Sequence, residues 1–242
     1  MKKSKLIVII IIILVVITSA ILGVHLIRKY TKYNKINNNV EKIKINGKEV
    51  EVPPTIESKP IIYLYPTDEM NVSIKLENNE KIICSYPKYN SNGWNVVAYP
   101  NGDLLDVDTN KNLYALYYES ENSLDFGIKD EGFIVKGEDS AKFLEEKLSI
   151  LGLTEREAEE FIIYWLPKLE SNNYNYIRFA TNEEINQNMP LEINPNPDTL
   201  IRVLMLYKGI DEPITVKEQE LKKVDRSGFV AVEWGGTELI DF

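Results

Sequence analysis

The sequence predicts an α+β fold: an antiparallel β-rich domain, arranged as a sandwich or a meander, with an inserted helical hairpin and one transmembrane helix before it. Three observations support this class. Short β-rich runs separated by turn residues fill most of the chain after residue 59, two amphipathic helical patterns interrupt them, and the N-terminal part holds one long apolar run. We therefore expect a basic tail, an anchor, a polar tether and a single extracytoplasmic domain, over residues 1–5, 6–27, 28–59 and 60–242.

The run from Leu6 to Ile27 carries no charge and, at about 1.5 Å per residue, is long enough to cross a hydrocarbon core of roughly 30 Å. Three lysines precede it, which is the layout of both a secretory signal and an uncleaved anchor. Cleavage near Ala20 would release a secreted domain, but the apolar residues beyond Ala20 favour an anchor. Basic residues flank both ends of the run, and the short lysine-containing tail favours a single-pass protein of the cell membrane with its N-terminus inside.

Charge and missing reactive residues exclude several classes of function. The formal net charge is −9 and the basic residues concentrate before residue 53, so the domain itself is strongly acidic and disfavours nucleic acid as a partner. The only histidine, His25, lies in the apolar run, so the domain cannot build a Ser-His-Asp or Cys-His catalytic group. The only cysteine, Cys84, lies in an apolar run and is predicted to be a buried, inert thiol. We find no metal-binding or phosphate-binding motif and expect no cofactor and no metal.

The first half of the domain is predicted to consist of strands. Asn92-Gly93 and Asn101-Gly102 mark tight turns between neighbouring runs, which is typical of antiparallel hairpins. The expected strands are Ile61–Tyr65, Val72–Leu76, Lys81–Tyr86, Trp94–Tyr99, Leu104–Val107 and Leu113–Tyr118, and a further short strand pattern lies in the tether between Val40 and Val52.

Two helices follow, one at Ser140–Leu151 and one that begins after Thr154. Thr154 and Glu157 have the spacing of a capping box, and apolar residues then recur at helical spacing as far as Leu169. Pro167 is predicted to kink this helix or to end it. Beyond it we expect strands at Tyr174–Ala180, Thr199–Tyr207 and Phe229–Trp234, and a short helix at Val216–Val224.

Two carboxylates are candidates for catalysis. Glu119 ends one predicted strand and Glu233 lies near the end of the last one, and a glycosidase needs two such acids facing one sugar beside aromatic side chains. The alternative is that two acids near strand ends arise by chance in a domain this rich in acidic residues.

Aromatic residues and one arginine are candidates for binding. Tyrosine and tryptophan crowd the first β-region, where they either line an exposed sheet face that binds carbohydrate or protein, or pack in the core as good strand formers. Tyr117 and Tyr118 are adjacent in one strand and must point to opposite faces. Arg202 is unusual inside an apolar strand and should pair with a buried carboxylate, either Glu192 or Glu233. The predicted binding residues are Trp94, Tyr118, Arg202 and Glu233.

Five segments carry recognisable motifs: KPIIYLYP at residues 59–66, GWNVVAYPNG at 93–102, IIYWLPKLE at 162–170, NPDTLIRV at 196–203 and VEWGG at 232–236. Together they resemble a family of bacterial envelope-associated proteins for which no activity is established. The resemblance covers roughly residues 59 to 238 and implies an envelope location without implying a site.

The sequence therefore predicts an envelope protein that residues 6–27 hold in the membrane and whose domain binds a cell-envelope polymer, such as a glycan, or another protein. The absence of histidine from the domain favours binding over catalysis. The alternative function is a carboxylate-dependent glycan hydrolase that uses Glu119 and Glu233.

Overall fold

The computed structural model describes residues 41–45, 48–52, 55–122 and 126–239 of the chain. The chain divides into two compact units, residues 1–54 and residues 55–242. In the first unit the described residues form a two-stranded antiparallel hairpin of β1 (Glu41–Ile45) and β2 (Lys48–Val52). The predicted anchor at residues 6–27 lies outside the described residues, and none of the helices within them is long and apolar enough to cross a membrane.

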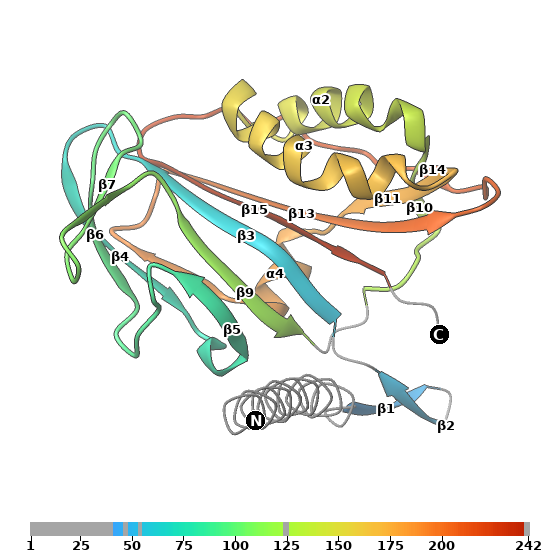
Figure 1. Cartoon of the computed structure of the whole chain (residues 1–242), viewed down its shortest axis with the longest axis horizontal. Coiled ribbons are helices and arrows are strands. Elements are labelled where there is room, and N and C mark those ends of the chain that lie inside the picture. Colours follow the sequence, from blue (N-terminus) through green and yellow to red (C-terminus); the bar gives the residue numbers. More distant parts are fainter. Residues whose placement is uncertain (1–40, 46–47, 53–54, 123–125, 240–242) are drawn as a thin grey trace, which may run out of the picture. The chain divides into compact units, whose positions relative to one another are not determined.

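The second unit is built on an eight-stranded sheet, the main sheet, with the order β14-β10-β11-β13-β15-β3-β9-β5 (Figure 1). Its neighbouring strands are antiparallel, except for the parallel pairs β13/β15 and β10/β14. The strands span Thr55–Tyr65 (β3), Ile82–Tyr86 (β5), Leu116–Asn122 (β9), Glu131–Lys136 (β10), Tyr174–Phe179 (β11), Thr199–Ile210 (β13), Lys217–Glu218 (β14) and Val230–Glu238 (β15).

A five-stranded antiparallel sheet, the second sheet, packs against one face of the main sheet, and its order is β12-β4-β6-β7-β8. Ile62 and Leu64 of β3 and Leu116 of β9 meet Ile74 and Val96 in the core between the two sheets. The second sheet consists of Met70–Leu76 (β4), Trp94–Ala98 (β6), Leu104–Asp106 (β7), Lys111–Leu113 (β8) and Leu191–Asn194 (β12). The predicted α+β class with mostly antiparallel sheets is thus confirmed.

Two helices, α2 (Ser140–Ile150) and α3 (Glu155–Glu170), cover the opposite face of the main sheet, over β10, β11, β13 and β15 (Figure 1). The predicted capping box is present, because the Thr154 side chain accepts from the Glu157 amide while the Glu157 carboxylate accepts from the Thr154 amide. Pro167 does not end α3. The donor that it lacks would bond to the carbonyl of Ile163 on the exposed side of the helix, and the buried Leu169 holds the last turn on the sheet.

Shorter elements complete the unit. Helix α4 (Asn182–Asn188) begins with a second capping box, formed by Thr181 and Glu184, and its Ile185 joins a small apolar cluster on the side of the main sheet opposite α2 and α3. One 3₁₀ turn, η1 (Asn79–Lys81), precedes β5 and another, η2 (Gly137–Asp139), leads into α2.

Two sequence predictions are wrong. Residues 216–224 form no helix: Lys217 and Glu218 make the short strand β14, and the extended chain after them places Leu221 and Val224 against the core under α2 and α3. Cys84 is exposed rather than buried, because β5 is an edge strand of the main sheet and no helix lies over it. Sequence periodicity reports the alternation of faces but not which faces the rest of the chain covers.

Candidate functional site

Arg202, Glu233 and Tyr118 meet in the interior of the protein, between the main sheet and the second sheet. Arg202 Nε donates to Glu233 Oε2 at 2.5 Å, and the Tyr118 hydroxyl donates to Glu233 Oε1 at 2.7 Å. Arg202 and Glu233 are register partners on the parallel strands β13 and β15, so the sheet itself brings them together. The predicted pairing of Arg202 with a buried carboxylate is confirmed, and the partner is Glu233 rather than Glu192.

The same arginine fastens the segment that contains α4 to the sheet. Arg202 Nη1 donates to Asn186 Oδ1 at 2.6 Å, and Nη2 donates to the carbonyl of Met189 at 2.9 Å. Burial removes water from the guanidinium, so each of its N–H groups needs another oxygen partner. These two bonds supply such partners. The network of Tyr118, Glu233 and Arg202, which we call the buried triplet, therefore stabilises the fold.

Trp94 belongs to the same interior region. Its Nε1 donates to the carbonyl of Pro87 at 2.9 Å, and its ring centroid lies 6.4 Å from that of Tyr118. The four predicted binding residues, Trp94, Tyr118, Arg202 and Glu233, are exposed by only 2, 1, 7 and 5%. The structure brings them together in the core, where they present almost no area to a ligand.

The two carboxylates of the hydrolase alternative lie on opposite faces of the main sheet. Tyr118 contacts Glu233 on the face toward the second sheet, and Glu119, the next residue of β9, points the other way. Glu119 lies on the same face of β9 as Tyr117, whose ring packs against the core on the helix side. A glycosidase needs both acids on either side of one sugar bond, and this arrangement does not provide that.

Five tyrosines gather on the helix side of the main sheet, and we call this group the tyrosine face. The Tyr63 ring centroid lies 6.5 Å from that of Tyr65, with the two rings nearly parallel, and 6.4 Å from that of Tyr114. Tyr117 lies beside Ile61 across the β3–β9 ladder, and Tyr164 projects from α3. The tyrosine face thus consists of Tyr63, Tyr65, Tyr114, Tyr117 and Tyr164, contributed by β3, β9, the chain before β9, and α3.

A carboxylate and a guanidinium complete a second Tyr–Glu–Arg triplet at this face. The Tyr63 hydroxyl donates to Glu160 Oε2 at 2.6 Å, and Arg156 Nε lies 3.4 Å from Glu160 Oε1. The Arg156 guanidinium also lies 5.6 Å from the centre of the Tyr114 ring. Because Arg156 is largely exposed, its remaining N–H groups stay available to a ligand that lies on the tyrosine rings.

A third triplet lies beside the second and joins α3 to the chain before β15. Arg226 donates to both oxygens of Glu157, at 2.7 and 3.2 Å, and its guanidinium lies 5.0 Å from the centre of the Tyr65 ring. The Glu157 carboxylate also lies close enough to the Tyr65 phenol to raise its pKa. Here the carboxylate is fully enclosed, so this triplet holds the end of the tyrosine face in place and leaves little of the carboxylate free.

The phenols of Tyr63, Tyr65 and Tyr117 remain protonated. Burial raises the pKa of Tyr63 and of Tyr65 far above the ordinary value, and the neighbouring carboxylates Glu160 and Glu157 raise it further. Burial likewise raises the pKa of Tyr117, and the neighbouring Glu119 carboxylate adds to the effect. The face therefore presents neutral aromatic rings next to carboxylates that accept hydrogen bonds, which is a combination suited to a polar, uncharged ligand.

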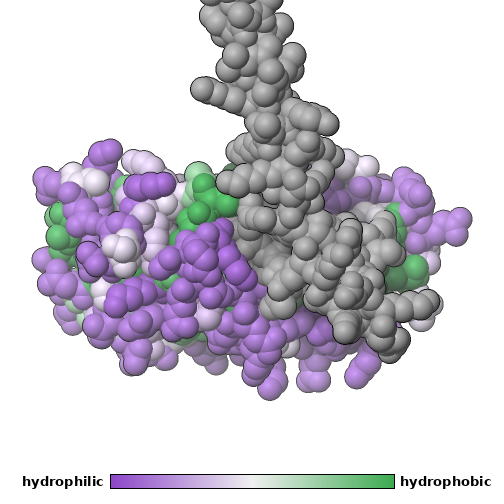
Figure 2. All heavy atoms as spheres, turned by 90° about the horizontal axis from the view of Figure 1, so that it is seen from below, coloured by the Kyte–Doolittle hydropathy of each residue, from purple (hydrophilic) through white to green (hydrophobic). Residues whose placement is uncertain are grey.

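The tyrosine face is open toward β9 and β5. In Figure 1 the two helices lie over the other half of the main sheet, and β9 and β5 lie beyond them. Tyr114 is 51% exposed, and Tyr86, the register partner of Tyr117 on the edge strand β5, is 54% exposed. On the face seen in Figure 2 the visible surface is mainly hydrophilic, and hydrophobic residues form only small groups.

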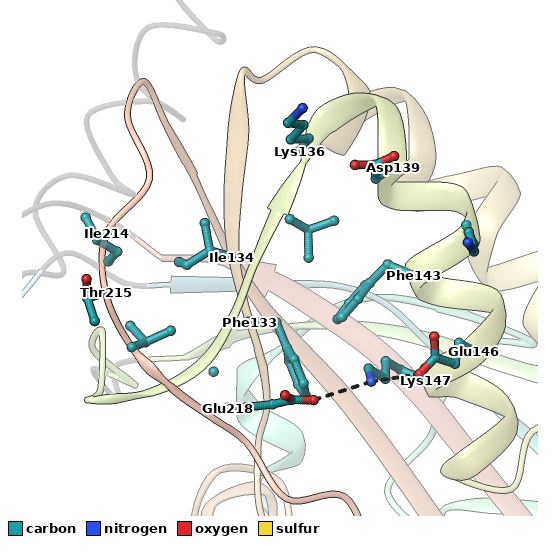
Figure 3. Close-up of a pocket in the computed structure, with 14 residues that line it drawn as sticks. Phe133, Ile134, Lys136, Asp139, Phe143, Glu146, Lys147, Ile214, Thr215 and Glu218 are labelled. Carbon is teal, nitrogen blue, oxygen red and sulfur yellow. Dashed lines mark hydrogen bonds and ion pairs between the residues drawn. The ribbon is translucent and has the colours of Figure 1, made fainter.

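A cavity of about 780 Å³ lies elsewhere, between β10, α2 and residues 214–218 (Figure 3). Three of its charged residues, Lys147, Glu146 and Glu218, are joined by ion pairs. Lys147 Nζ lies 2.9 Å from Glu146 and 3.8 Å from Glu218, and it sits 5.0 Å from the centre of the Phe133 ring. A cation that already has two carboxylates and an aromatic ring as partners offers little to a ligand, so we regard the tyrosine face as the better candidate site.

Sequence reasoning considered an aromatic sheet face but did not single out these five tyrosines, because they come from three separate segments. One signal was nevertheless present in α3. Arg156, Glu160, Tyr164 and Lys168 recur every four residues and form a polar stripe directly beside the apolar stripe that packs on the sheet. A polar stripe with an embedded tyrosine at the margin of a buried face indicates a helix that borders a site.

Within the described residues no three His, Cys, Asp or Glu side chains are grouped so that they could hold a metal ion. No protein-family model matches the chain, and no curated protein and no solved structure is significantly similar to it. The assignment of a function therefore depends on the residues and on their geometry.

Proposed function

We propose that this chain is a membrane-anchored protein of the cell envelope whose extracytoplasmic domain binds an uncharged glycan on the tyrosine face. The observation that carries the proposal is the exposed Tyr114 ring beside the Arg156–Glu160 pair, which the buried Tyr63 holds in place through its hydrogen bond to Glu160. The C–H face of a sugar ring packs on an aromatic ring, while its hydroxyl groups both donate and accept hydrogen bonds. A carboxylate and a guanidinium next to the rings supply both kinds of partner.

Electrostatics favours an uncharged polymer over an anionic one. The formal charge of the chain is −9 and its basic residues concentrate before residue 53, so phosphate-rich or carboxylate-rich polymers would be repelled by the domain. The run at residues 6–27 would keep the domain at the membrane, and the polar tether at 28–59 would let it reach the polymer.

A binding experiment tests the glycan proposal. The full chain in detergent micelles is titrated with β-1,4-linked N-acetylglucosamine oligosaccharides and mixed with cell-wall glycan stripped of anionic polymers. Tyr114→Ala should weaken binding about tenfold, as expected for an aromatic contact worth roughly 1.4 kcal/mol. Tyr99→Ala removes a half-exposed tyrosine of the second unit from outside the tyrosine face and should leave binding unchanged. Equal losses in the two variants, or no binding to either probe, would rule out the proposal.

The proposed orientation is tested separately. An external protease added to intact cells without an outer barrier should cleave the domain, and the same protease added to inverted membrane vesicles should not. The reverse pattern would place the domain in the cytoplasm. A domain found only in the medium would instead support cleavage near Ala20.

A further inference from the structure

The outer side of the helical hairpin contains a groove that the tyrosine face does not use. The groove has a volume of about 780 Å³ and lies between α2 and α3. Ala141 and Ser149 of α2 and Ala158 of α3 line it with short side chains, which leaves room between the helices. Ile162 and Leu166 form its apolar floor on the side of α3.

Helix α3 carries more apolar surface than the sheet buries. One stripe, which includes Phe161 and Trp165, is fully buried against the main sheet. A second set, at Ile162, Ile163 and Leu166, lines the groove, and Ile163 is 67% exposed, the largest value among the exposed large hydrophobic residues that the structure describes. A helix with apolar residues on this additional side has a surface to cover with a partner.

Three glutamates border the groove, Glu145 on α2 and Glu155 and Glu159 on α3. None of them forms an ion pair with a described residue, and no lysine or arginine is among the residues that line the groove. On the other flank of α3 the situation is reversed, since Glu157 and Glu160 both pair with arginines. The helix dipole stabilises the negative charge of Glu155, which lies in the first turn of α3. Glu145 and Glu159 do not lie in a first turn and lack this stabilisation.

We propose that this groove binds an amphipathic helix of a partner protein whose apolar stripe is flanked by lysine or arginine. The exposed isoleucine and the apolar floor would take the apolar stripe, and the three glutamates would pair with the flanking cations. The lining residues of α3 run from Glu155 to Leu166, which at about 1.5 Å per residue corresponds to roughly three helical turns of contact. The site lies on the opposite flank of α3 from the tyrosine face, so the proposal stands independently of glycan binding.

The first experiment uses a designed probe because the natural partner is unidentified. A fluorescent leucine–lysine peptide of about 14 residues with helical spacing is titrated into the full chain in neutral detergent, and a leucine–glutamate peptide of the same pattern serves as the control. The lysine peptide should bind and gain helical circular dichroism, and the glutamate peptide should not. Binding should weaken at high salt, because the flanking ion pairs are exposed.

Variants then locate the binding site. Glu145→Gln with Glu159→Gln should raise the Kd of the lysine peptide about threefold to tenfold, whereas Glu183→Gln with Glu192→Gln removes the same charge from exposed positions outside the groove and should leave the Kd within twofold. Ile163→Ser should raise the Kd by at least fivefold. Equal effects of the two charge pairs would mean unspecific attraction and overturn the proposal. A dimer of the chain that Ile163→Ser dissociates, with no peptide binding to the monomer, would overturn it in favour of a second copy.

Discussion

The protein contains the same trio of side chains in two different environments, and the comparison explains what each does. Tyr118, Glu233 and Arg202 form the buried triplet between the sheets, and the hydrogen bonds that join them are short and enclosed. Tyr63, Glu160 and Arg156 repeat the chemistry at the edge of the helix-covered face, where the side chain of Arg156 is 76% exposed. Because the buried triplet is enclosed, it serves only the structure. In the second triplet the exposed Arg156 keeps N–H groups that are available to a ligand.

The largest effect is expected from breaking the buried triplet. Glu233→Gln leaves the buried Arg202 guanidinium without its counter-charge, and removing one partner of a buried pair costs about 3–5 kcal/mol. The equivalent change in the second triplet, Glu160→Gln, should cost less than about 1 kcal/mol, because its Arg156 partner is exposed. Urea unfolding of the two variants, followed by tryptophan fluorescence, measures the difference. Equal losses of stability in both would contradict the assignment of distinct roles.

An intermediate effect is expected at the third triplet. Glu157 is enclosed but keeps its capping-box bond to the Thr154 amide when its arginine partner is removed. Arg226→Ala should therefore lower the free energy of unfolding by about 2 kcal/mol, between the two changes above. Lys223→Ala, at an exposed residue three positions away, is the control and should change it by less than about 0.5 kcal/mol. A value for Arg226→Ala as small as that of the control would show that the capping box alone satisfies Glu157.

The ion pair around Glu184 extends the comparison to pH. Burial opposes ionisation of Glu184, but hydrogen bonds from Arg178 and Lys129 outweigh it and lower the pKa to about 2. Because the pKa is lower in the folded state than in the unfolded state, the pair stabilises the domain above the unfolded value of 4.5 and its contribution is lost as pH falls from there toward 2. Wild type should lose about 1–2 kcal/mol over this range that the Glu184→Gln variant does not lose. Parallel acid unfolding profiles of the two proteins would refute the assignment.

The sequence predicted those parts of the fold that local patterns determine. The capping box at Thr154 and the amphipathic pattern of α3 fix a helix start and a buried face, and both are as expected. The pairing of Arg202 with a buried carboxylate followed from a simple rule, because a charge inside an apolar strand requires a counter-charge nearby, whereas the choice of Glu233 over Glu192 came from the strand register. These features depend on residues within one element or on one obligatory interaction.

Features that depend on how elements assemble were not predictable. Trp94 and Tyr118 were expected on a binding surface, yet both lie in the core between the two sheets, while Cys84 was expected in the core and lies exposed on an edge strand. The parallel pairing of β13 with β15 and the short strand β14 depend on where the chain after residue 210 crosses the sheet. Alternation along a strand separates its two faces, but only the assembled layers decide which face meets solvent.

Arg156→Ala should have the smallest effect on stability and a clear effect on glycan binding. Arg156→Ala removes an exposed ion pair with Glu160 and a contact with the Tyr114 ring, so the free energy of unfolding should change by less than about 0.5 kcal/mol. Glycan binding, in contrast, should weaken about fivefold or more, because a charged donor beside the rings is lost. Arg156→Lys keeps the charge but not the planar guanidinium group. Its glycan affinity should therefore lie between those of wild type and Arg156→Ala. Urea unfolding and glycan titration on the same preparations give both numbers. If Arg156→Ala loses stability but keeps its glycan affinity, the second triplet is structural like the buried triplet. The two triplets would then have the same role despite their different exposure.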